Sequence, residues 1–198
     1  KEKANDDSKS LAKSCGEPSI LKGYGRRNTT LCAVAPTTSS AFILGQVSQS
    51  IEPIWSNCYV KDIDKMKVTI KNLALEKLLE EKGENTKETW RSIRDRDGSV
   101  QHLGCLTDAE KEVFKTFPEI NQHTIIEQAA MRQIYIDQGQ SLNIMVNPAT
   151  PVKEINKFYI DAWKLGVKTL YYQHSMNAAQ QLGREKLAAN NTCVGCEA

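Results

Sequence analysis

The feature that most constrains the fold is an alternation of short apolar runs with helical apolar stripes in the second half of the chain. Residues 141–146 (SLNIMV) and 167–172 (VKTLYY) have the length and composition of buried strands. Between them, apolar residues recur at helical spacing from Ile155 to Trp163, and Gly166 follows where that helix should end. Strands separated by helices are joined by crossovers and lie parallel, so the pattern predicts an α/β fold.

The first half of the chain repeats this alternation. Residues 29–35 (TTLCAVA) form an apolar run of strand length that stops at Pro36, and residues 41–48 (AFILGQVS) suit the first turns of a buried helix. Residues 56–60 are a further strand candidate, and residues 70–78 carry apolar side chains at helical spacing. Five or fewer strands would leave uncovered sheet edges, which a place within a larger barrel would remove.

Local signals define further boundaries. Thr107 and Glu110 have the spacing of a capping box, which predicts the start of a helix. Residues 1–20 are polar, so we expect ordered structure to begin near Leu21 and the body to span 21–175. Polar and small residues dominate 176–198, which predicts a flexible tail.

The composition is that of a soluble protein with a core, because 40% of the 198 residues are hydrophobic and 25% are charged. The 26 basic and 24 acidic residues are spread along the chain, which indicates a charged small molecule as ligand rather than nucleic acid. No apolar run approaches the roughly 20 residues of a membrane span, and the first residues lack the apolar core of a secretion signal. We therefore expect a cytoplasmic protein without membrane contact.

The first residue is Lys1 rather than Met, which indicates a processed N-terminus or a fragment.

A run of hydroxyl side chains is the first candidate site. Pro36, Thr37, Thr38, Ser39 and Ser40 precede the predicted helix at 41–48. The first turn of a helix has unpaired N–H groups and a positive dipole end, which suit a phosphate. Judged by these residues alone, a plain helix cap is the commoner explanation.

Two adjacent tyrosines, Tyr171 and Tyr172, are the second candidate. Tyrosine can lose an electron and a proton, and neighbouring rings allow transfer between them. Core packing is the alternative, because adjacent strand residues normally point to opposite faces. The three histidines, His102, His123 and His174, fall at no metal-ligand spacing, so we expect no metal site.

The third candidate is the pair Cys193 and Cys196 near the C-terminus. Thiols at this spacing can form a disulfide and exchange it with a partner. The tail contains no further zinc ligands at a suitable spacing, so a thiol carrier is favoured over a metal site, with two incidental thiols as the alternative. The other cysteines are scattered singly, which fits a reducing compartment.

Together, PTTSSAFILGQVSQSIEP, IDQGQSLNI, GVKTLYY and the terminal CxxC resemble the C-terminal half of the large subunit of class I ribonucleotide reductase, in order and approximate spacing. The resemblance covers about residues 21–172 and the tail. It implies the second half of a ten-stranded α/β barrel, and reduction of ribonucleoside diphosphates to deoxyribonucleoside diphosphates for DNA synthesis.

The resemblance also assigns roles to the three candidate sites. The hydroxyl run 36–40, here called the hydroxyl loop, would hold the substrate diphosphate. Tyr171 and Tyr172 would carry a radical from a small, metal-containing subunit toward the active site. Cys193 and Cys196 would re-reduce the active-site disulfide and be reduced in turn by thioredoxin or glutaredoxin.

One departure from the family pattern limits these expectations. The family's radical cysteine lies in an Asn-x-Cys-x-Glu loop that is absent here, since Cys58 directly follows Asn57 and Val60 stands two residues on. In the family, this cysteine and the regions that bind effector nucleotides precede the matched segment. The chain is therefore expected to act only with an N-terminal part, as a split or partial subunit. A stand-alone thiol-disulfide carrier on an α/β body, or a nucleotide-binding module without catalysis, are the alternatives.

Overall fold

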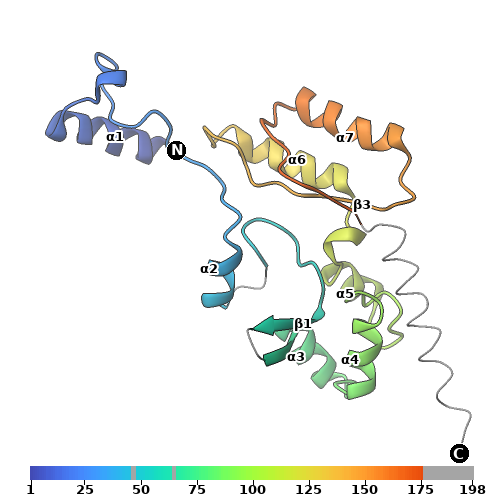
Figure 1. Ribbon diagram of the computed structural model, residues 1–198. Helices are drawn as coiled ribbons and strands as arrows, with labels where there is room; N and C mark the ends of the chain where they lie inside the picture. Colours follow the sequence, from blue (N-terminus) through green and yellow to red (C-terminus); the bar gives the residue numbers. More distant parts are fainter. Residues whose placement is uncertain (46–47, 64–65, 176–198) are drawn as a thin grey trace, which may run out of the picture. The chain divides into compact units, whose positions relative to one another are not determined.

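The computed structural model describes residues 1–45, 48–63 and 66–175 (Figure 1). Its helices are α1 (Glu2–Cys15), α2 (Thr38–Ile43), α3 (Leu73–Glu81), α4 (Lys87–Arg94), α5 (Asp108–Val113), α6 (Gln122–Gln133) and α7 (Val152–Lys164). Short 3-10 turns occupy Ser19–Leu21 and Phe117–Glu119, and the strands are β1 (Cys58–Ile63), β2 (Met66–Lys71), β3 (Ile144–Val146) and β4 (Gln173–Ser175). Within these ranges, no helix has both the length and the apolar character of a membrane span.

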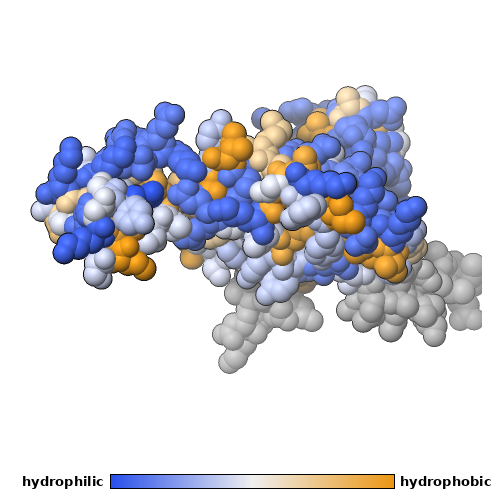
Figure 2. Space-filling view, turned by 90° about the horizontal axis from the view of Figure 1, so that it is seen from above, coloured by the Kyte–Doolittle hydropathy of each residue, from blue (hydrophilic) through white to orange (hydrophobic). Residues whose placement is uncertain are grey.

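The chain divides into two compact units. Unit 1 comprises residues 1–36, 122–144 and 151–173, and unit 2 comprises the other described residues. Figure 2 shows apolar side chains as separate patches on a largely hydrophilic face.

Helix α1 in unit 1 corrects the expectation that ordered structure begins near Leu21. The segment is polar, yet the buried hydroxyl of Ser8 accepts hydrogen bonds from the backbone N–H groups of Arg27 and Asn28 at 3.2 and 3.0 Å. The Arg27 guanidinium donates to the carbonyls of Cys15 and Gly16, at 3.1 and 2.7 Å, at the end of the helix. The following loop thus stabilises a helix that has little apolar surface of its own.

The extended segments that include Val34, β3 and β4 are shorter than the sequence predicts. Val34 forms a single parallel bridge with Gln140, and the Ser141 N–H donates to the Val34 carbonyl at 2.9 Å. Downstream, β3 pairs with β4, and the Tyr171 N–H donates to the Leu142 carbonyl at 2.8 Å. The parallel direction of the Val34–Gln140 bridge agrees with the predicted α/β fold, but residues 29–35 form no regular strand.

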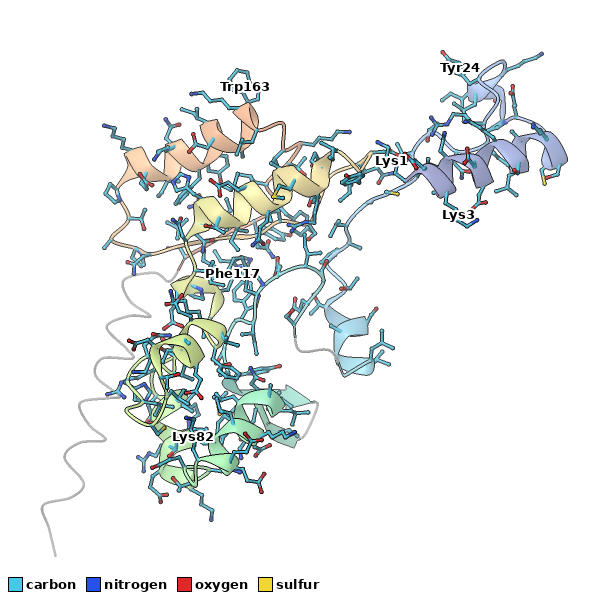
Figure 3. All side chains as sticks on the ribbon, turned by 180° about the vertical axis from the view of Figure 1, so that it is seen from behind. Lys1, Lys3, Tyr24, Lys82, Phe117 and Trp163 are labelled. Carbon is cyan, nitrogen blue, oxygen red and sulfur yellow. The ribbon has the colours of Figure 1, made fainter. Side chains whose placement is uncertain are left out.

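Helices α6 and α7 pack against each other in unit 1. They bury Ile125, Ile126 and Ala129 on α6, and Phe158 and Ala162 on α7. The apolar stripe on α7 also has an outer part, because Trp163 is 77% exposed and points away from the helix in Figure 3.

Unit 2 contains an antiparallel hairpin where the sequence analysis expected a parallel strand and an early helix. β1 and β2 pair from Cys58 opposite Lys71 to Ile63 opposite Met66. Only two residues separate these strands, and so short a connection joins antiparallel strands, since a parallel pair needs a long crossover. The predicted helix at 70–78 begins instead at Leu73.

Side-chain caps fix the helices of unit 2. Asn72 caps α3 by accepting from the Ala74 N–H at 3.1 Å, and Thr86 caps α4 by accepting from the Thr89 N–H at 3.1 Å. The predicted capping box of Thr107 and Glu110 is confirmed at the start of α5. These helices and the hairpin enclose one apolar core, formed by Cys58, Leu75, Leu79, Trp90, Ile93, Val100, Leu103, Leu106 and Phe114.

Candidate functional site

The hydroxyl loop starts a helix, as predicted, but the helix is short. α2 spans six residues and begins at Thr38, and the Ala41 N–H donates to the Thr37 carbonyl at 2.9 Å. Thr37 itself has a φ of 47°, a left-handed conformation that is rare for a β-branched residue. The turn before α2 is therefore sharp and specifically held.

The two threonine hydroxyls hold this turn against the segment that follows α2. The Thr37 hydroxyl accepts from the Ser50 N–H, and the Thr38 hydroxyl donates to the Gln49 side-chain oxygen, both at 3.0 Å. Ser39 and Ser40 are exposed in the first turn. Because first-turn N–H groups have no partner inside a helix, hydroxyls and amides here can together surround an anion.

Tyr171 and Tyr172 lie in ring contact. Their ring centroids are 4.3 Å apart at an interplanar angle of 61°, and the residues are 51% and 57% exposed. The hydrogen bond with Tyr172 is the main cause that raises the pKa of Tyr171. Such exposure does not fit core packing, and two hydrogen-bonded phenols in contact can exchange a proton together with an electron.

The ring contact arises from a local departure from strand geometry. In a regular strand, adjacent side chains point to opposite faces. The regular strand β4 begins only at Gln173, so the two tyrosines precede it and both rings turn toward each other. The predicted strand at 167–172 is thus displaced, and this displacement brings the two phenols together.

The thiol groups divide into two sets. Cys193 and Cys196 lie outside the described residues, so their role remains a prediction. Cys58 lies in the core of unit 2, where burial raises the pKa of its thiol. The described cysteines, including Cys15, Cys32 and Cys105, are all free thiols.

An aromatic cluster around Trp55 was not predicted. In unit 2, Trp55 makes edge contacts with His174 and Phe117 at centroid distances of 4.7 and 5.7 Å. Figure 3 labels Phe117, which is fully buried. The Trp55 indole N–H donates to the buried Glu52 carboxylate at 3.2 Å. The three-residue spacing of Glu52 and Trp55 is the sequence signal that could have suggested this hydrogen bond.

A second unpredicted cluster joins α6 to α7. His123 Nε2 lies 2.8 Å from Glu154, and Nδ1 lies 3.1 Å from Asp161. The two carboxylates are seven residues apart, which places them two turns apart on one helix face and is a signal that the sequence offered. Among the described residues, no group of three or more His, Cys, Asp or Glu side chains is arranged to hold a metal ion.

Comparisons with known proteins agree with the family resemblance of the sequence. Residues 6–173 match the family model described as ribonucleotide reductase, barrel domain. The ribonucleoside-diphosphate reductase large subunit of Invertebrate iridescent virus 3 is 42% identical over 163 residues, which is 81% of this chain and 26% of that protein. The large subunit of Danio rerio is 39% identical over 178 residues, covering 87% of this chain and 22% of that protein.

A solved structure extends the likeness to three dimensions. The class Id ribonucleotide reductase alpha subunit of Actinobacillus ureae has a TM-score of 0.79 and 60% sequence identity, covering 90% of this chain and 32% of that one. The chain thus spans about a third or less of these relatives. With its α/β fold and the match over residues 6–173, the chain belongs to the ribonucleotide reductase barrel-domain family.

Proposed function

We propose that the chain is the C-terminal part of a ribonucleoside-diphosphate reductase large subunit, and that it acts with an N-terminal part and a small subunit to convert ribonucleoside diphosphates to deoxyribonucleoside diphosphates. The observation that carries this proposal is the ring contact of Tyr171 and Tyr172 at 4.3 Å. Because the chain spans only part of its relatives, the proposal depends on the side chains that this part contains.

The hydroxyl loop is the proposed holder of the substrate diphosphate. Thr37 and Thr38 use their hydroxyls to fix the turn, as their bonds to Ser50 and Gln49 indicate. Ser39 and Ser40 are then the side chains that donate to phosphate oxygens, together with the first-turn N–H groups. Pro36 restricts the backbone φ angle at the start of the turn.

The tyrosine pair is the proposed radical route. When one phenol is oxidised, it loses one electron and one proton and becomes a phenoxyl radical. The adjacent phenol then supplies one electron and one proton, which restores the first ring and moves the radical by one residue. In this proposal, the metal-containing small subunit supplies the radical, and a cysteine of the N-terminal part receives it. Effector nucleotides also bind outside this segment.

The remaining assignments follow the family pattern. Residues 21–175 would contribute the second half of a ten-stranded barrel, which the parallel bridge between Val34 and Gln140 supports. Cys193 and Cys196 would transfer electrons as thiols from thioredoxin or glutaredoxin to the active-site disulfide. The tail would thus restore the enzyme between turnovers.

The test is reconstitution with the N-terminal part and the small subunit, followed by measurement of deoxynucleotide formation. Tyr171→Phe and Tyr172→Phe keep each ring but remove the phenolic O–H, so turnover should fall below detection while substrate binding is retained. Tyr24→Phe, at an exposed tyrosine in unit 1, is the matched control and should turn over normally. Normal turnover by the Tyr171→Phe/Tyr172→Phe double variant would contradict the proposed route.

A further inference from the structure

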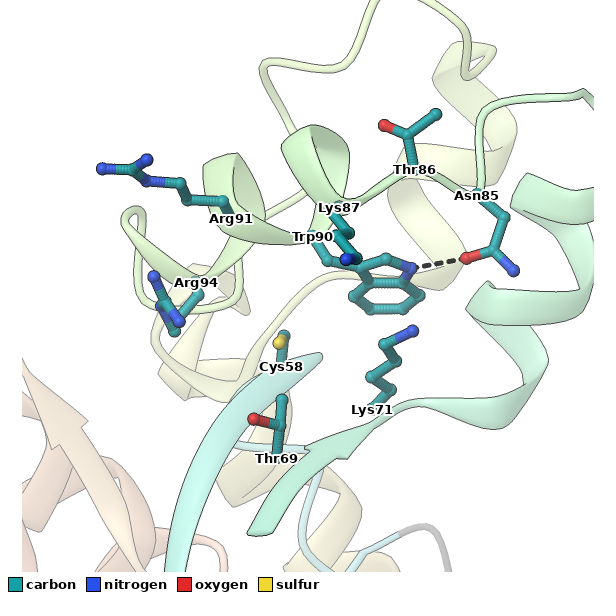
Figure 4. A pocket seen from close by; sticks show the side chains of 9 residues that line it. All are labelled: Cys58, Thr69, Lys71, Asn85, Thr86, Lys87, Trp90, Arg91 and Arg94. Atoms are coloured by element: carbon teal, nitrogen blue, oxygen red, sulfur yellow. Dashed lines mark hydrogen bonds between the residues drawn. The ribbon is translucent and has the colours of Figure 1, made fainter. Parts of the chain in front are cut away.

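A pocket lined by basic side chains lies within unit 2, between the β1–β2 hairpin and helix α4 (Figure 4). It is open to solvent and has a volume of about 280 Å³. Lys71 reaches it from β2, and Lys87, Arg91 and Arg94 reach it from α4. None of its lining residues is acidic.

The positive charge of this basic pocket is only partly balanced. Lys71 pairs with the Glu76 carboxylate at 2.7 Å. Arg91 and Arg94 share the single carboxylate of Asp95, at 3.7 and 3.6 Å. Two carboxylates, those of Glu76 and Asp95, therefore form ion pairs with three of the four cationic side chains. Lys87 forms no ion pair within the described part of the chain, so the pocket has an excess of positive charge.

One wall of the basic pocket is formed by a buried tryptophan. Trp90 is only 6% exposed, and its indole N–H donates to the Asn85 side-chain oxygen at 2.7 Å. The Lys71 ammonium lies 4.6 Å from the centre of the same ring. Figure 4 shows Lys71 and Arg94 on opposite sides of Cys58, which lies in the core. The cationic side chains thus lie next to the buried Trp90 and Cys58, which belong to the core of unit 2.

We propose that the basic pocket binds a small phosphate-bearing molecule, at a site separate from the hydroxyl loop. A singly charged carboxylate would leave charge uncompensated, whereas a phosphate or pyrophosphate group carries several charges and matches the planar donors of arginine. The N-terminus of α4, at Thr86 and Lys87, adds a positive dipole end. The volume lies just below the range of about 300–1,000 Å³ that is typical for drug-sized ligands, which favours a compact ligand.

The experiment titrates inorganic pyrophosphate into the full chain and follows the indole N–H signal of Trp90 by NMR, assigned with a Trp90→Phe variant. Lys87→Gln and Arg94→Gln should each weaken binding by about tenfold, because each removes a charge-assisted hydrogen bond. Lys77→Gln, on α3 outside the pocket lining, is the matched control and should bind as the unaltered chain does. A Ser39→Val variant should leave the Trp90 response unchanged, which separates this site from the proposed substrate loop.

Parallel titrations with phosphate and ADP identify the source of the phosphate group. Tighter binding of ADP than of pyrophosphate would indicate a nucleotide, and weaker or equal binding would indicate a smaller phosphate compound. The proposal is overturned if pyrophosphate gives no saturable Trp90 response. It is equally overturned if sodium chloride at matched ionic strength reproduces the response, or if folded Lys87→Gln and Arg94→Gln variants bind as tightly as Lys77→Gln.

Discussion

Replacing Asn57 by alanine should destabilise unit 2 more than its small change in volume suggests. Asn57 is fully buried, and its amide nitrogen donates to the carbonyls of Gly98 and Phe114 at 2.9 and 2.8 Å. Its amide oxygen accepts from the Asn72 side chain at 2.9 Å. One side chain therefore joins the start of β1, the turn after α4, the end of α5 and the cap of α3.

The magnitude follows from which groups lose their partners. The Gly98 carbonyl also accepts from the Asn57 backbone N–H at 3.4 Å, so it keeps one bond in the variant. The Phe114 carbonyl and the Asn72 amide lose the bonds described here, and a buried polar group without a partner costs about 1–3 kcal/mol. We expect the free energy of unfolding of unit 2 to fall by about 2–4 kcal/mol.

Urea unfolding followed at the Trp90 indole signal measures this change, because Trp90 belongs to the same core. Gln101→Ala is the matched control, since this exposed amide also donates to a carbonyl, that of Lys111, at 3.0 Å. The control should change the free energy by less than about 0.5 kcal/mol. An Asn57→Ala effect as small as that of Gln101→Ala would refute the argument that buried hydrogen bonds hold these elements together.

Two further predictions concern a glycine and a charged pair. Gly98→Ala should lower the free energy of unfolding of unit 2 by about 2–4 kcal/mol, because Gly98 has a φ of 87° and a Cβ would lie 2.5 Å from the Asn57 backbone nitrogen. The control is Gly104→Ala, which has open space around it and should have little effect in the same urea assay. The hydrogen bond with His123 is the main cause that lowers the pKa of Glu154. The ionised Glu154 carboxylate therefore stabilises the fold above its ordinary pKa of 4.5. This stabilisation is lost as the pH falls through the lower pKa of the folded state. His123→Ala should move the pKa of Glu154, measured by carbon NMR, back toward 4.5, and an unchanged pKa would contradict the assigned cause.

How much the sequence predicted depended on whether a signal was local. The capping box of Thr107 and Glu110 and the end of α7 near Gly166 were predicted correctly, because these features depend on residues a few positions apart. The hairpin was missed because residues 66–69 form a strand only through pairing with β1. Helix α1 was missed because its support comes from Arg27 and Asn28, beyond the helix itself.

The candidate sites followed the same division. The hydroxyl loop and the tyrosine pair were located by residue type and order, and both lie within residues 6–173, which match the family model; their roles stay predictions. The geometry within each was not predictable, because the turn at Thr37 includes a hydrogen bond to the distant Ser50 and because the tyrosines precede β4 rather than lying in a regular strand. The His123 cluster joins two helices and was visible only once they were packed.

The surroundings of Cys58 bear on which thiol reacts in the proposed enzyme. Asn57 directly precedes Cys58, and its amide is engaged with backbone and side-chain partners. Cys58 packs in the core, and burial is the main cause that raises the pKa of its thiol. Its neighbours in this core include Leu75, Leu79 and Trp90, so Cys58 contributes to the packing of unit 2. This arrangement supports the proposal that an N-terminal part contributes the radical cysteine, while this chain supplies the phosphate loop and the tyrosine route.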